Sequence, residues 1–308
     1  MSVRHEPVLV AEVLSYLRNG AGLYLDATLG DGGHADALLR AEPDARLLGT
    51  DRDPHALAFA RTRLARYGDR VTTAHATFRE LPTVHAGLGG EPLAGALLDL
   101  GLSSRQIDDP ARGISWRNDG PLDLRMDPDH GVPVSERLRT VDVATLTRVL
   151  REHGDLPSAG RLARAMIAAA LDGVLDTTLA LARLIDRAAG GHAHPRRQAQ
   201  VFQALRMWVN EEAEDLEAVL GWLPGALRPG AVVVTLAYHS GEDRRIKQAL
   251  RGRPETAPAR RLPPNPAERS PVLWKELARG GVVPSETETT ANPRARSARL
   301  RAFRRTSA

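Results

Sequence analysis

The most informative stretch of the sequence is an apolar run that leads into a glycine-rich turn, Leu23-Tyr24-Leu25-Asp26-Ala27-Thr28-Leu29-Gly30-Asp31-Gly32-Gly33. A short apolar run closed by glycines is typical of a buried strand followed by a tight connection into a helix. Further runs at 46–51, 71–76 and 95–100 alternate with helical patterns, one of which begins at Pro54, a favourable first helical residue. This alternation predicts an α/β fold with a mostly parallel sheet and helices on both faces.

The next strand pattern, at 231–237, begins too far along the chain for an ordinary crossover helix, so other structure must be inserted before it. A loop rich in Gly, Pro and Asp comes first, and helical patterns follow near 142–153, 158–172, 178–189 and from Pro195 onward. We therefore expect the first part of a sheet domain at 1–107, an inserted loop and helical domain at 108–212, and the second part of the sheet domain, with a basic C-terminal segment, at 213–308. Residues 294–303 are expected to supply a last strand at the edge of the sheet.

The composition excludes several classes of protein. With 42% hydrophobic residues in a chain of 308, a packed core can form, and the lack of cysteine excludes disulfides, zinc-thiolate sites and a thiol nucleophile. No apolar run approaches the roughly 18 to 20 residues of a membrane helix, and the first residues lack the pattern of a secretory signal. We therefore expect a cytoplasmic protein.

Charge is distributed unevenly along the sequence. The formal net charge is only +4, but residues 244–308 contain 16 Lys and Arg against 5 Asp and Glu. Such a basic segment on an otherwise mildly acidic chain favours a polyanionic partner such as nucleic acid. A solvated, arginine-rich tail explains the same charges equally well, so both interpretations stay open.

Asp26 and Asp51 flank the turn formed by Gly30, Gly32 and Gly33. An acid about 20 residues after such a turn is the general pattern of a nucleotide site, in which Asp51 accepts hydrogen bonds from ribose hydroxyls. Asp26 would repel the pyrophosphate of a dinucleotide but favours the ammonium or sulfonium of S-adenosylmethionine. The alternative is that Asp26 caps the turn and Asp51 only begins the next loop. The pattern favours a methyltransferase over a nicotinamide oxidoreductase.

Several further motifs occur in order along nearly the whole chain. They are His5-Glu6-Pro7-Val8-Leu9, Asp26-Ala27-Thr28-Leu29-Gly30-Asp31-Gly32-Gly33-His34, Asp51-Arg52-Asp53-Pro54, Asp99-Leu100-Gly101-Leu102-Ser103-Ser104-Arg105-Gln106-Ile107-Asp108, Arg112-Gly113-Ile114-Ser115-Trp116, Asp119-Gly120-Pro121-Leu122-Asp123-Leu124-Arg125-Met126-Asp127, His194-Pro195, Phe202-Gln203-Ala204-Leu205-Arg206, His239-Ser240 and Asn292-Pro293-Arg294-Ala295-Arg296-Ser297. Together they resemble the RsmH (MraW) family of ribosomal RNA methyltransferases. The chain departs from that family at 154–157, where a pair of glutamates is usual, and at Gly241, where a leucine is usual.

The resemblance implies a Rossmann-like class I methyltransferase fold with an inserted helical domain, and N4-methylation of a cytidine in the decoding region of small-subunit (16S) ribosomal RNA. It implies S-adenosylmethionine as cofactor, no metal, and small-subunit ribosomal RNA or the small subunit as partner, and it leaves a homodimer open. The cofactor contacts that it implies are Gly32, Gly33, His34, Asp51, Phe78, Asp99 and Gln106. Phe78 suits the edge of an adenine, but a core phenylalanine is the alternative.

Methyl transfer to the exocyclic amine of cytosine needs a hydrogen-bond acceptor, because the lone pair of that amine is delocalised into the ring. Asp99, Ser103 and Ser104 follow the fourth strand, where many amino-methyltransferases carry such an acceptor, and are candidates by location. Turn formation explains the two serines equally well. His239, after the fifth strand, is a candidate for orienting the cytosine. A histidine satisfied at a strand end, or a metal site with the acids that follow it, are the alternatives.

Candidate RNA contacts occur in a loop whose guanidinium, carboxylate and aromatic groups suit an extruded base and its phosphates. They are Arg112, Trp116, Asp123 and Arg125. An internally salt-bridged lid is the alternative. Near the C-terminus, an alternating series would present a positive strand face to phosphates, or only protect an edge strand. Its members are Arg294, Arg296, Arg299 and Arg301. Arg196 and Arg197, on the long helical pattern, are expected to lie on a solvated face.

Two other classes of function stay in view. An assembly factor that binds RNA without turnover would keep the same fold, but it has no need of Asp26, Asp51 and an intact glycine turn. A small-molecule or DNA methyltransferase is the nearest enzymatic alternative, because the basic segment suits either nucleic acid. Substrate tests separate these possibilities.

Overall fold

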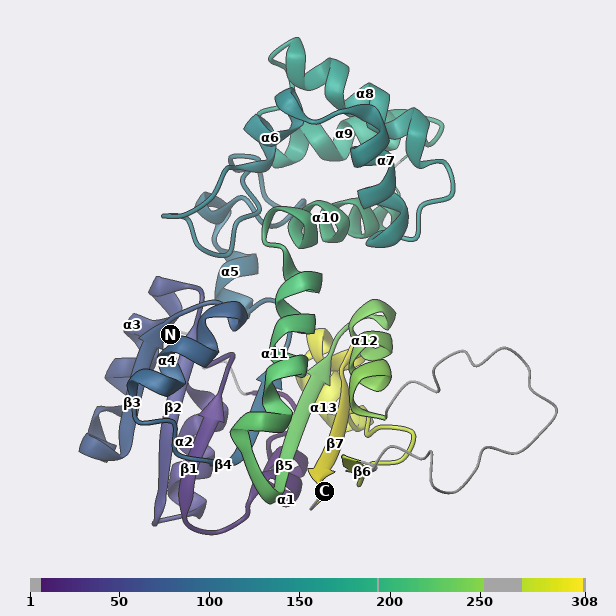
Figure 1. Ribbon diagram of the computed structural model, residues 1–308. Helices are drawn as coiled ribbons and strands as arrows, with labels where there is room; N and C mark the ends of the chain where they lie inside the picture. The colour runs from purple at the N-terminus through teal and green to yellow at the C-terminus, as the bar shows by residue number, and fades with distance from the viewer. Residues whose placement is uncertain (1–6, 193, 252–272, 307–308) are drawn as a thin grey trace, which may run out of the picture. The chain divides into compact units, whose positions relative to one another are not determined.

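The computed structural model describes residues 7–192, 194–251 and 273–306. The chain forms two compact units, which are described separately (Figure 1). The sheet unit comprises Met1–Gly101 and Glu214–Ala308, and the helical unit comprises Leu102–Ala213. His5 and Glu6 of the first family motif, and residues 252–272 of the basic segment, lie outside the described residues.

The sheet unit is built on a seven-stranded sheet in the order β3-β2-β1-β4-β5-β7-β6. The strands are β1 Gly22–Asp26, β2 Ala45–Asp51, β3 Val71–His75, β4 Leu93–Asp99, β5 Leu227–Ala237, β6 Trp274–Glu276 and β7 Arg299–Arg305. The five strands from β3 to β5 in this order pair in parallel, whereas β7 is antiparallel to both β5 and β6. This is the Rossmann-like class I methyltransferase arrangement, so the predicted α/β fold class with its mostly parallel sheet and helical insertion is confirmed.

Helices cover both faces of the sheet, because successive residues of a strand point to opposite sides. Tyr24 packs with the helices of one face, whereas Leu23 and Leu25 pack with those of the other. The first face is covered by α1 Val10–Leu17, α2 Gly33–Ala41 and α3 Pro54–Leu64, and the second by α4 Leu81–Gly87, α11 Glu212–Ala226 and α12 Ser240–Leu250. Burial on both faces explains why the central strands are continuous apolar runs in the sequence.

The last strand differs from the prediction. Residues 294–297 lie in a 3-10 helix, η5 Pro293–Ser297, because its first residue is proline and the side chain of Asn292 accepts a hydrogen bond from the backbone N–H of Arg294 at 3.2 Å. β7 begins only at Arg299 and lies between β5 and β6. The expected edge strand at 294–303 is therefore wrong in both its start and its position. The helix α13 Glu286–Ala291 lies between β6 and η5 in the chain.

The helical unit has its own hydrophobic core, which among the described residues shares no member with the two cores of the sheet unit. Its helices are α5 Ser104–Asp108, α6 Val134–Thr140, α7 Val143–Glu152, α8 Ala159–Leu171, α9 Thr178–Ala188 and α10 Pro195–Val209. The last four occur where the helical patterns predict them, whereas no pattern predicts α6. Glu211, with φ of 51°, separates α10 from α11.

The long loop between α5 and α6 is ordered by a buried amide. Asn210 Nδ2 donates to the carbonyl of Leu124 at 2.8 Å, and Asn210 Oδ1 accepts from the backbone N–H of Met126 at 2.8 Å. Leu124 is fully buried and has φ of 63°, a conformation that an L residue adopts only where its surroundings fix it.

In the ranges that the structure describes, none of the helices is long and apolar enough to cross a membrane.

Candidate active site

Three carboxylates lie at the carboxyl ends of neighbouring strands in the sheet unit. Asp26 ends β1, Asp51 ends β2 and Asp99 ends β4. β1 pairs with both of the other strands, so Asp26 belongs to the strand between them. The strand order reverses at β1, and α/β sheets bind their ligands outside the carboxyl ends of the strands at such a point.

The glycine turn after β1 is bonded to Asp51. One oxygen of this carboxylate accepts from the backbone N–H of Gly30 at 2.7 Å, and the other accepts from that of Asp53 at 2.8 Å. Gly30 and Gly32 have φ of 50° and 74°, which glycine adopts without a steric cost. Gly33 begins α2. A Cβ at Gly33 would lie only 2.4 Å from the ring of Pro7, so this end of the turn has no room for a side chain.

Burial controls the charge of the first two carboxyls. Asp26 is 3% exposed, and this burial raises its pKa to about 7, although the nearby His34 lowers it. Burial also raises the pKa of Asp51 to about 6, against the effect of the backbone donors of Asp53 and Gly30. A negative charge is costly in such a position, and a neighbouring cation lowers that cost. The pair therefore favours a ligand that carries positive charge.

Asp99 is held in place by three residues. Its Oδ1 accepts a hydrogen bond from the phenol of Tyr238 at 2.9 Å, its Oδ2 lies 3.4 Å from His34 Nε2, and its backbone N–H donates to Thr28 Oγ1 at 2.6 Å. Both ring nitrogens of the buried His34 lack a hydrogen-bond partner among the described residues. Orphaned polar atoms beside a carboxylate are suited to the polar groups of a ligand.

Tyr238 is a site residue that the sequence analysis missed. It follows β5, which pairs with β4 so that Leu236 lies opposite Asp99. Gly101, which follows β4 and lies next to the Tyr238 ring, has φ of 101°, a conformation that L residues with a side chain rarely adopt. Burial, and then the charge of Asp99, raise the pKa of Tyr238 far above its usual value, so its hydroxyl stays a donor. The available signal was a polar aromatic residue directly after a strand of the sheet centre.

His239 caps the helix that follows it. Its Nδ1 accepts from the backbone N–H of Glu242 at 3.4 Å, its Nε2 lies 3.0 Å from Glu242 Oε1, and Glu242 Oε2 in turn accepts from the backbone N–H of His239 at 3.3 Å. The Nδ1 contact caps the helix, whereas the buried Nε2 makes no hydrogen bond among the described residues. A Cβ added to Gly241 would lie 3.1 Å from His239 Nδ1. Glycine at this position, where the family usually has leucine, leaves that ring uncrowded.

Ser103 is the N-cap of α5 in the helical unit. Its Oγ accepts from the backbone N–H of Gln106 at 3.2 Å, and Gln106 Oε1 accepts from the backbone N–H of Ser103 at 2.9 Å. This reciprocal arrangement is a capping box, which is the turn role that the sequence left as an alternative. Gln106 is buried, and Ser104 is the first residue of the helix.

The loop that carries four predicted RNA contacts is bonded within the helical unit. Arg112 Nη2 donates to a backbone carbonyl of the same loop at 2.6 Å, and Arg125 donates from Nε and Nη2 to the two oxygens of Asp123, each at 2.7 Å. The Trp116 ring lies 5.7 Å, between centroids, from a phenylalanine ring of α10. These contacts agree with an internally salt-bridged loop. All four side chains are half-buried, so part of each stays accessible.

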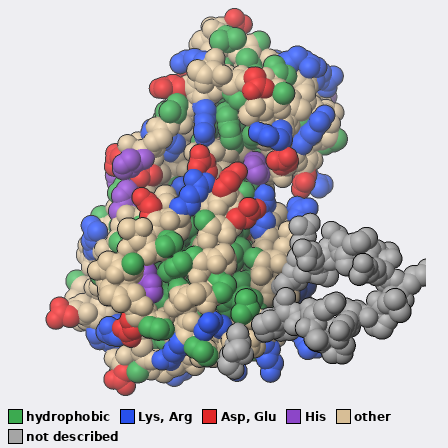
Figure 2. All heavy atoms as spheres, viewed as in Figure 1, with side chains coloured by type: hydrophobic (Ala, Val, Ile, Leu, Met, Phe, Trp, Pro, Cys, Tyr) green, Lys and Arg blue, Asp and Glu red, His purple; other side chains and the backbone are tan. Residues whose placement is uncertain are grey.

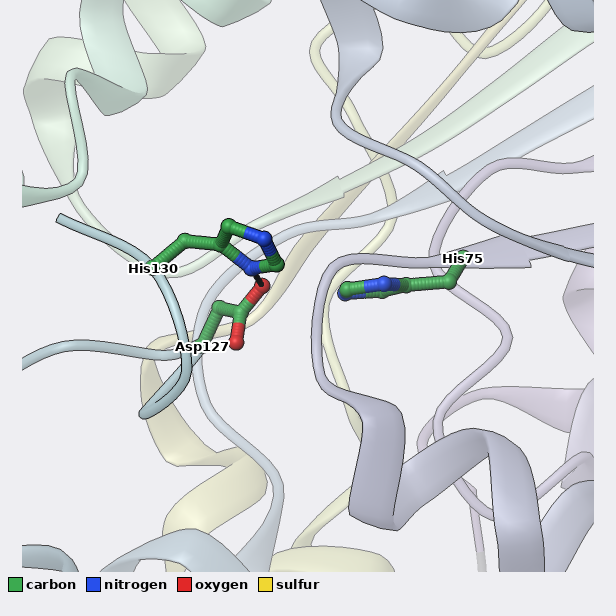
Figure 3. A group of neighbouring side chains, drawn as sticks. All are labelled: His75, Asp127 and His130. Carbon is green, nitrogen blue, oxygen red and sulfur yellow. Dashed lines mark hydrogen bonds and ion pairs between the residues drawn. The ribbon is translucent and has the colours of Figure 1, made fainter.

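Figure 3 shows a further contact in this loop, where His130 Nδ1 and Asp127 Oδ2 are 2.8 Å apart. His75, which is labelled in the same figure, ends β3 in the sheet unit and hydrogen-bonds through Nε2 to the carbonyl of Arg52 at 2.9 Å. Each histidine thus has a partner in its own unit. Neither needs a metal ion to explain its position.

Asp215 of α11 is a second residue that the sequence analysis missed. Its buried carboxylate lies 3.0 Å from Arg79 Nε and 3.4 Å from Arg52 Nη2. Arg52 follows Asp51 and Arg79 follows Phe78, so Asp215 ties together two segments that carry predicted cofactor contacts. In the sequence it looks like an ordinary acid on a solvated helix, and nothing in its spacing indicates burial.

The remaining predicted residues differ in exposure. Phe78 begins a short 3-10 helix and packs, half-buried, against the core of the second face. Arg294 and Arg296 are exposed on η5. Arg301, which the predicted alternation would have pointed at phosphates, is only 3% exposed and pairs with the carboxylate of Asp243. The expected positive strand face is therefore wrong at this position, because the strand lies inside the sheet.

The model of the MraW methylase family matches residues 2–306, a range that includes the strand-end carboxylates, the glycine turn and the helical unit. The chain belongs to the MraW methylase family. The resemblance inferred from the motifs is thereby confirmed, and the chain is a methyltransferase.

Two relatives of this MraW methylase carry the name ribosomal RNA small subunit methyltransferase H. The one from Sorangium cellulosum is 42% identical over 307 residues, which cover 98% of this chain and 91% of that protein. The one from Frankia alni is 43% identical over 315 residues, which cover 98% of this chain and 95% of that protein. Among solved structures, an rRNA methylase from Streptococcus thermophilus matches with a TM-score of 0.42 and 8% identity over 97% of this chain and 94% of that chain.

The two units of this MraW methylase divide the predicted site residues between them. The sheet unit carries Asp26, Gly30, Gly32, Gly33, His34, Asp51, Phe78, Asp99, His239, Arg294 and Arg296. The helical unit carries Ser103, Ser104, Gln106, Arg112, Trp116, Asp123 and Arg125. Contacts within the sheet unit bring together His34, Asp99 and the additional residue Tyr238, and they join the glycine turn to Asp51.

Proposed function

We propose that this MraW methylase uses S-adenosylmethionine to methylate N4 of a cytidine in the decoding region of small-subunit (16S) ribosomal RNA. The observation that carries the proposal is the row of strand-end carboxylates, Asp26, Asp51 and Asp99, beside a glycine turn that is hydrogen-bonded to Asp51. Relatives at 42% and 43% identity named for the small ribosomal subunit support the class of substrate. The motif resemblance supports the N4 position and the decoding region.

The residues present fit S-adenosylmethionine. Bound there, the cofactor supplies a methyl group activated on a sulfonium, so the chain has no need to activate it further. Asp26 provides negative charge for the ammonium or sulfonium, and Asp51 keeps lone pairs for the ribose hydroxyls beyond its two backbone bonds. We assign the ring nitrogens of His34, which lack a hydrogen-bond partner within the described ranges, to polar groups of the cofactor. We assign the half-buried ring of Phe78 to the edge of its adenine.

Asp99 is the acceptor that we assign to the target amine. Its carboxylate is 23% exposed, so an edge stays accessible while Tyr238 and His34 fix the other side. The hydrogen bond from the amine to a fixed acceptor strengthens as the amine gains positive charge. The acceptor is already in position, so the site does not reorganise in the transition state. Transfer forms the N4–methyl bond as the sulfur–methyl bond breaks, and the amine then loses one proton. Ser103 and Ser104 are second candidates, and His239 is proposed to orient the base.

RNA contacts are assigned to both units. In the helical unit we propose Arg112, Trp116, Asp123 and Arg125, whose exposed portions combine positive charge with an aromatic face. In the sheet unit we propose Arg294 and Arg296, which are exposed on η5. We propose that the sheet domain, at 1–107 and 213–308, binds the cofactor. The inserted domain at 108–212 then carries out much of the RNA recognition.

The test is transfer of labelled methyl from S-adenosylmethionine to small ribosomal subunits that lack the modification, followed by identification of the labelled nucleoside. We expect N4-methylcytidine at one site, and loss of transfer in Asp99→Asn. Label in another nucleoside, or equal transfer to unrelated DNA, would contradict the proposal. Tight cofactor binding without transfer to subunits, free RNA or DNA would favour the assembly-factor alternative.

A further inference from the structure

A hollow of about 330 Å³ lies within the helical unit, where the loop before α8 meets the start of α10. We call it the α8–α10 hollow. Its lining consists of Leu156, Pro157, Ser158, His194, Pro195, Arg196, Arg197 and Gln200. Ligand pockets generally measure roughly 300 to 1,000 Å³, so this hollow suits one small group rather than a whole cofactor. No residue in its lining carries a negative charge.

Two helices begin at this hollow, and neither is capped by the side chain of its own N-cap residue. Ser158 is the N-cap of α8 and His194 is the N-cap of α10, and neither side chain accepts a hydrogen bond from its helix. The first turns of both helices also lack acidic residues. Uncapped N–H groups and the positive ends of two helix dipoles therefore point to the same region, which favours an anion.

The placement of arginines adds positive charge where a helix alone would disfavour it. Arg196 and Arg197 occupy the first turn of α10, the end of the helix at which cations are unfavourable. Arg196 is exposed, and Arg197 has a buried Nε that lacks a hydrogen-bond partner among the described residues. Cations at the disfavoured end of a helix, in a hollow whose described lining has no acidic side chain, are suited to an anion from outside the chain.

The start of α10 is also fixed before any ligand arrives. Asp186 accepts from the backbone N–H of His194 at 3.0 Å and, on both of its oxygens, from Gln198 Nε2 at 3.0 Å. This carboxylate is thus committed to positioning the helix and does not line the hollow. The arginines of the first turn start from a rigid base, which reduces the entropy lost on binding.

We propose that the α8–α10 hollow binds a backbone phosphate of the RNA substrate, separately from the site of methyl transfer. The guanidinium groups of Arg196 and Arg197 and the free N–H groups of α10 hold the phosphate oxygens. Leu156, Pro157 and Pro195 offer an apolar surface to the adjoining sugar. Basic side chains lie interspersed with acidic ones on the face of the molecule that Figure 2 shows, so the positive charge of the proposed site is local to the hollow. The proposal rests on the proposed RNA substrate.

The test compares two kinds of variant in the full chain. Arg196→Gln/Arg197→Gln removes the two cations, whereas Ser158→Glu adds an acid at the N-cap of α8, where it stabilises the helix but repels a phosphate. Ala144→Glu is the matched control, because it adds the same charge at an exposed position in the first turn of α7, away from the hollow. Binding of a fluorescein-labelled fragment of small-subunit ribosomal RNA is measured by anisotropy at several salt concentrations, and melting temperatures are recorded.

We expect the double variant and Ser158→Glu to weaken RNA binding about tenfold or more, with Ser158→Glu keeping or raising the melting temperature. Loss of one phosphate contact should lower the slope of log K against log salt by about 0.7 for single-stranded RNA. Wild-type affinity in both variants, or an equal loss in Ala144→Glu, would overturn the inference. A wild-type chain that fails to methylate small subunits would instead overturn the proposed function, and methylation with an unchanged KM for subunits in the double variant would overturn the inference alone.

Discussion

The phenol of Tyr238 and the carboxylate of Asp99 are joined by a 2.9 Å hydrogen bond between the ends of two neighbouring strands. The bond connects the acceptor that we assign to the target amine with the segment that follows β5. Since burial holds Tyr238 in its protonated form, the donor is constant across the working range of pH. Tyr238 is therefore a positioning residue for Asp99.

Tyr238→Phe is expected to lower kcat roughly tenfold, since a hydrogen bond to a charged group is worth about 1.5 to 3 kcal/mol. The KM for S-adenosylmethionine and the melting temperature should change little, because the ring is kept. Tyr67→Phe is the matched control, since it removes a phenol bond of 2.8 Å to Asp36 away from the site. An equal fall of kcat in both variants would mean that Tyr238 acts only through stability.

Asp26→Asn is expected to raise stability more at pH 8 than at pH 5. The folded pKa of Asp26 is about 7, above the unfolded value near 4, so the unfolded chain ionises first and the wild type loses stability as pH rises from about 4 to 7. The asparagine variant escapes this loss, which amounts to at most about 4 kcal/mol. Denaturant unfolding at several pH values checks the prediction, and a variant less stable than wild type at pH 8 would refute it.

The same Asp26→Asn variant should bind S-adenosylmethionine more weakly. In the wild type, cofactor affinity should rise with pH through about 7, because a bound cation favours the ionised carboxylate. Calorimetry in buffers of different ionisation enthalpy should detect release of a proton on binding at pH 6, and the variant should lose this component. Binding that is independent of pH in both proteins would remove Asp26 from the cofactor site.

Asp51→Ala is expected to reduce cofactor affinity at least about tenfold, through loss of charge-assisted bonds to the ribose. Some stability is lost as well, because the backbone N–H groups of Gly30 and Asp53 lose their acceptor. Asp53→Ala is the control, since it removes the N-cap of α3 without touching the proposed ribose contact. Equal loss of affinity in the two variants, measured by calorimetry, would mean that Asp51 serves only the turn.

Arg301 and its neighbour Arg299 should behave differently. Arg301 pairs with Asp243 and Glu276 while 3% exposed, and removal of one partner from a buried ion pair costs about 3 to 5 kcal/mol. Arg301→Gln should therefore lower the melting temperature, whereas Arg299→Gln, at an exposed position, should change it little. RNA affinity per folded molecule should be unchanged in Arg301→Gln. A salt-dependent loss of RNA binding in Arg301→Gln would mean that Arg301 contacts phosphates after all.

Much of the fold follows from local sequence because the central strands are buried on both faces. The runs that become β1, β2 and β4 are mostly apolar and each ends in aspartate, so their ends are visible without the structure. β6 has only three residues and depends on pairing with β7, which no local pattern records. The break at Glu211 is hidden for a similar reason, because a buried amide of the preceding residue, rather than a helix-breaking residue, shapes the connection.

The site was predictable where chemistry coincides with strand ends. Asp26, Asp51 and Asp99 are marked by their place after apolar runs, whatever their tertiary contacts. Tyr238 and Asp215 interact with partners more than a hundred residues away in the chain. The place of Tyr238 after a central strand is its one local signal, and the sequence around Asp215 gives none. Side chains that interact with a distant segment need the fold before they can be recognised.

The inner position of β7 has a consequence for how the chain is made. A ribosome delivers β5 well before β7, so the apolar run at 231–237 must wait with one edge uncovered until its antiparallel neighbour has been synthesised. An uncovered apolar strand edge is a template for pairing with other chains. A translation product interrupted anywhere between these strands would thus tend to aggregate or require a chaperone, and the quality of the enzyme pool would depend on how promptly the ribosome reaches residue 305.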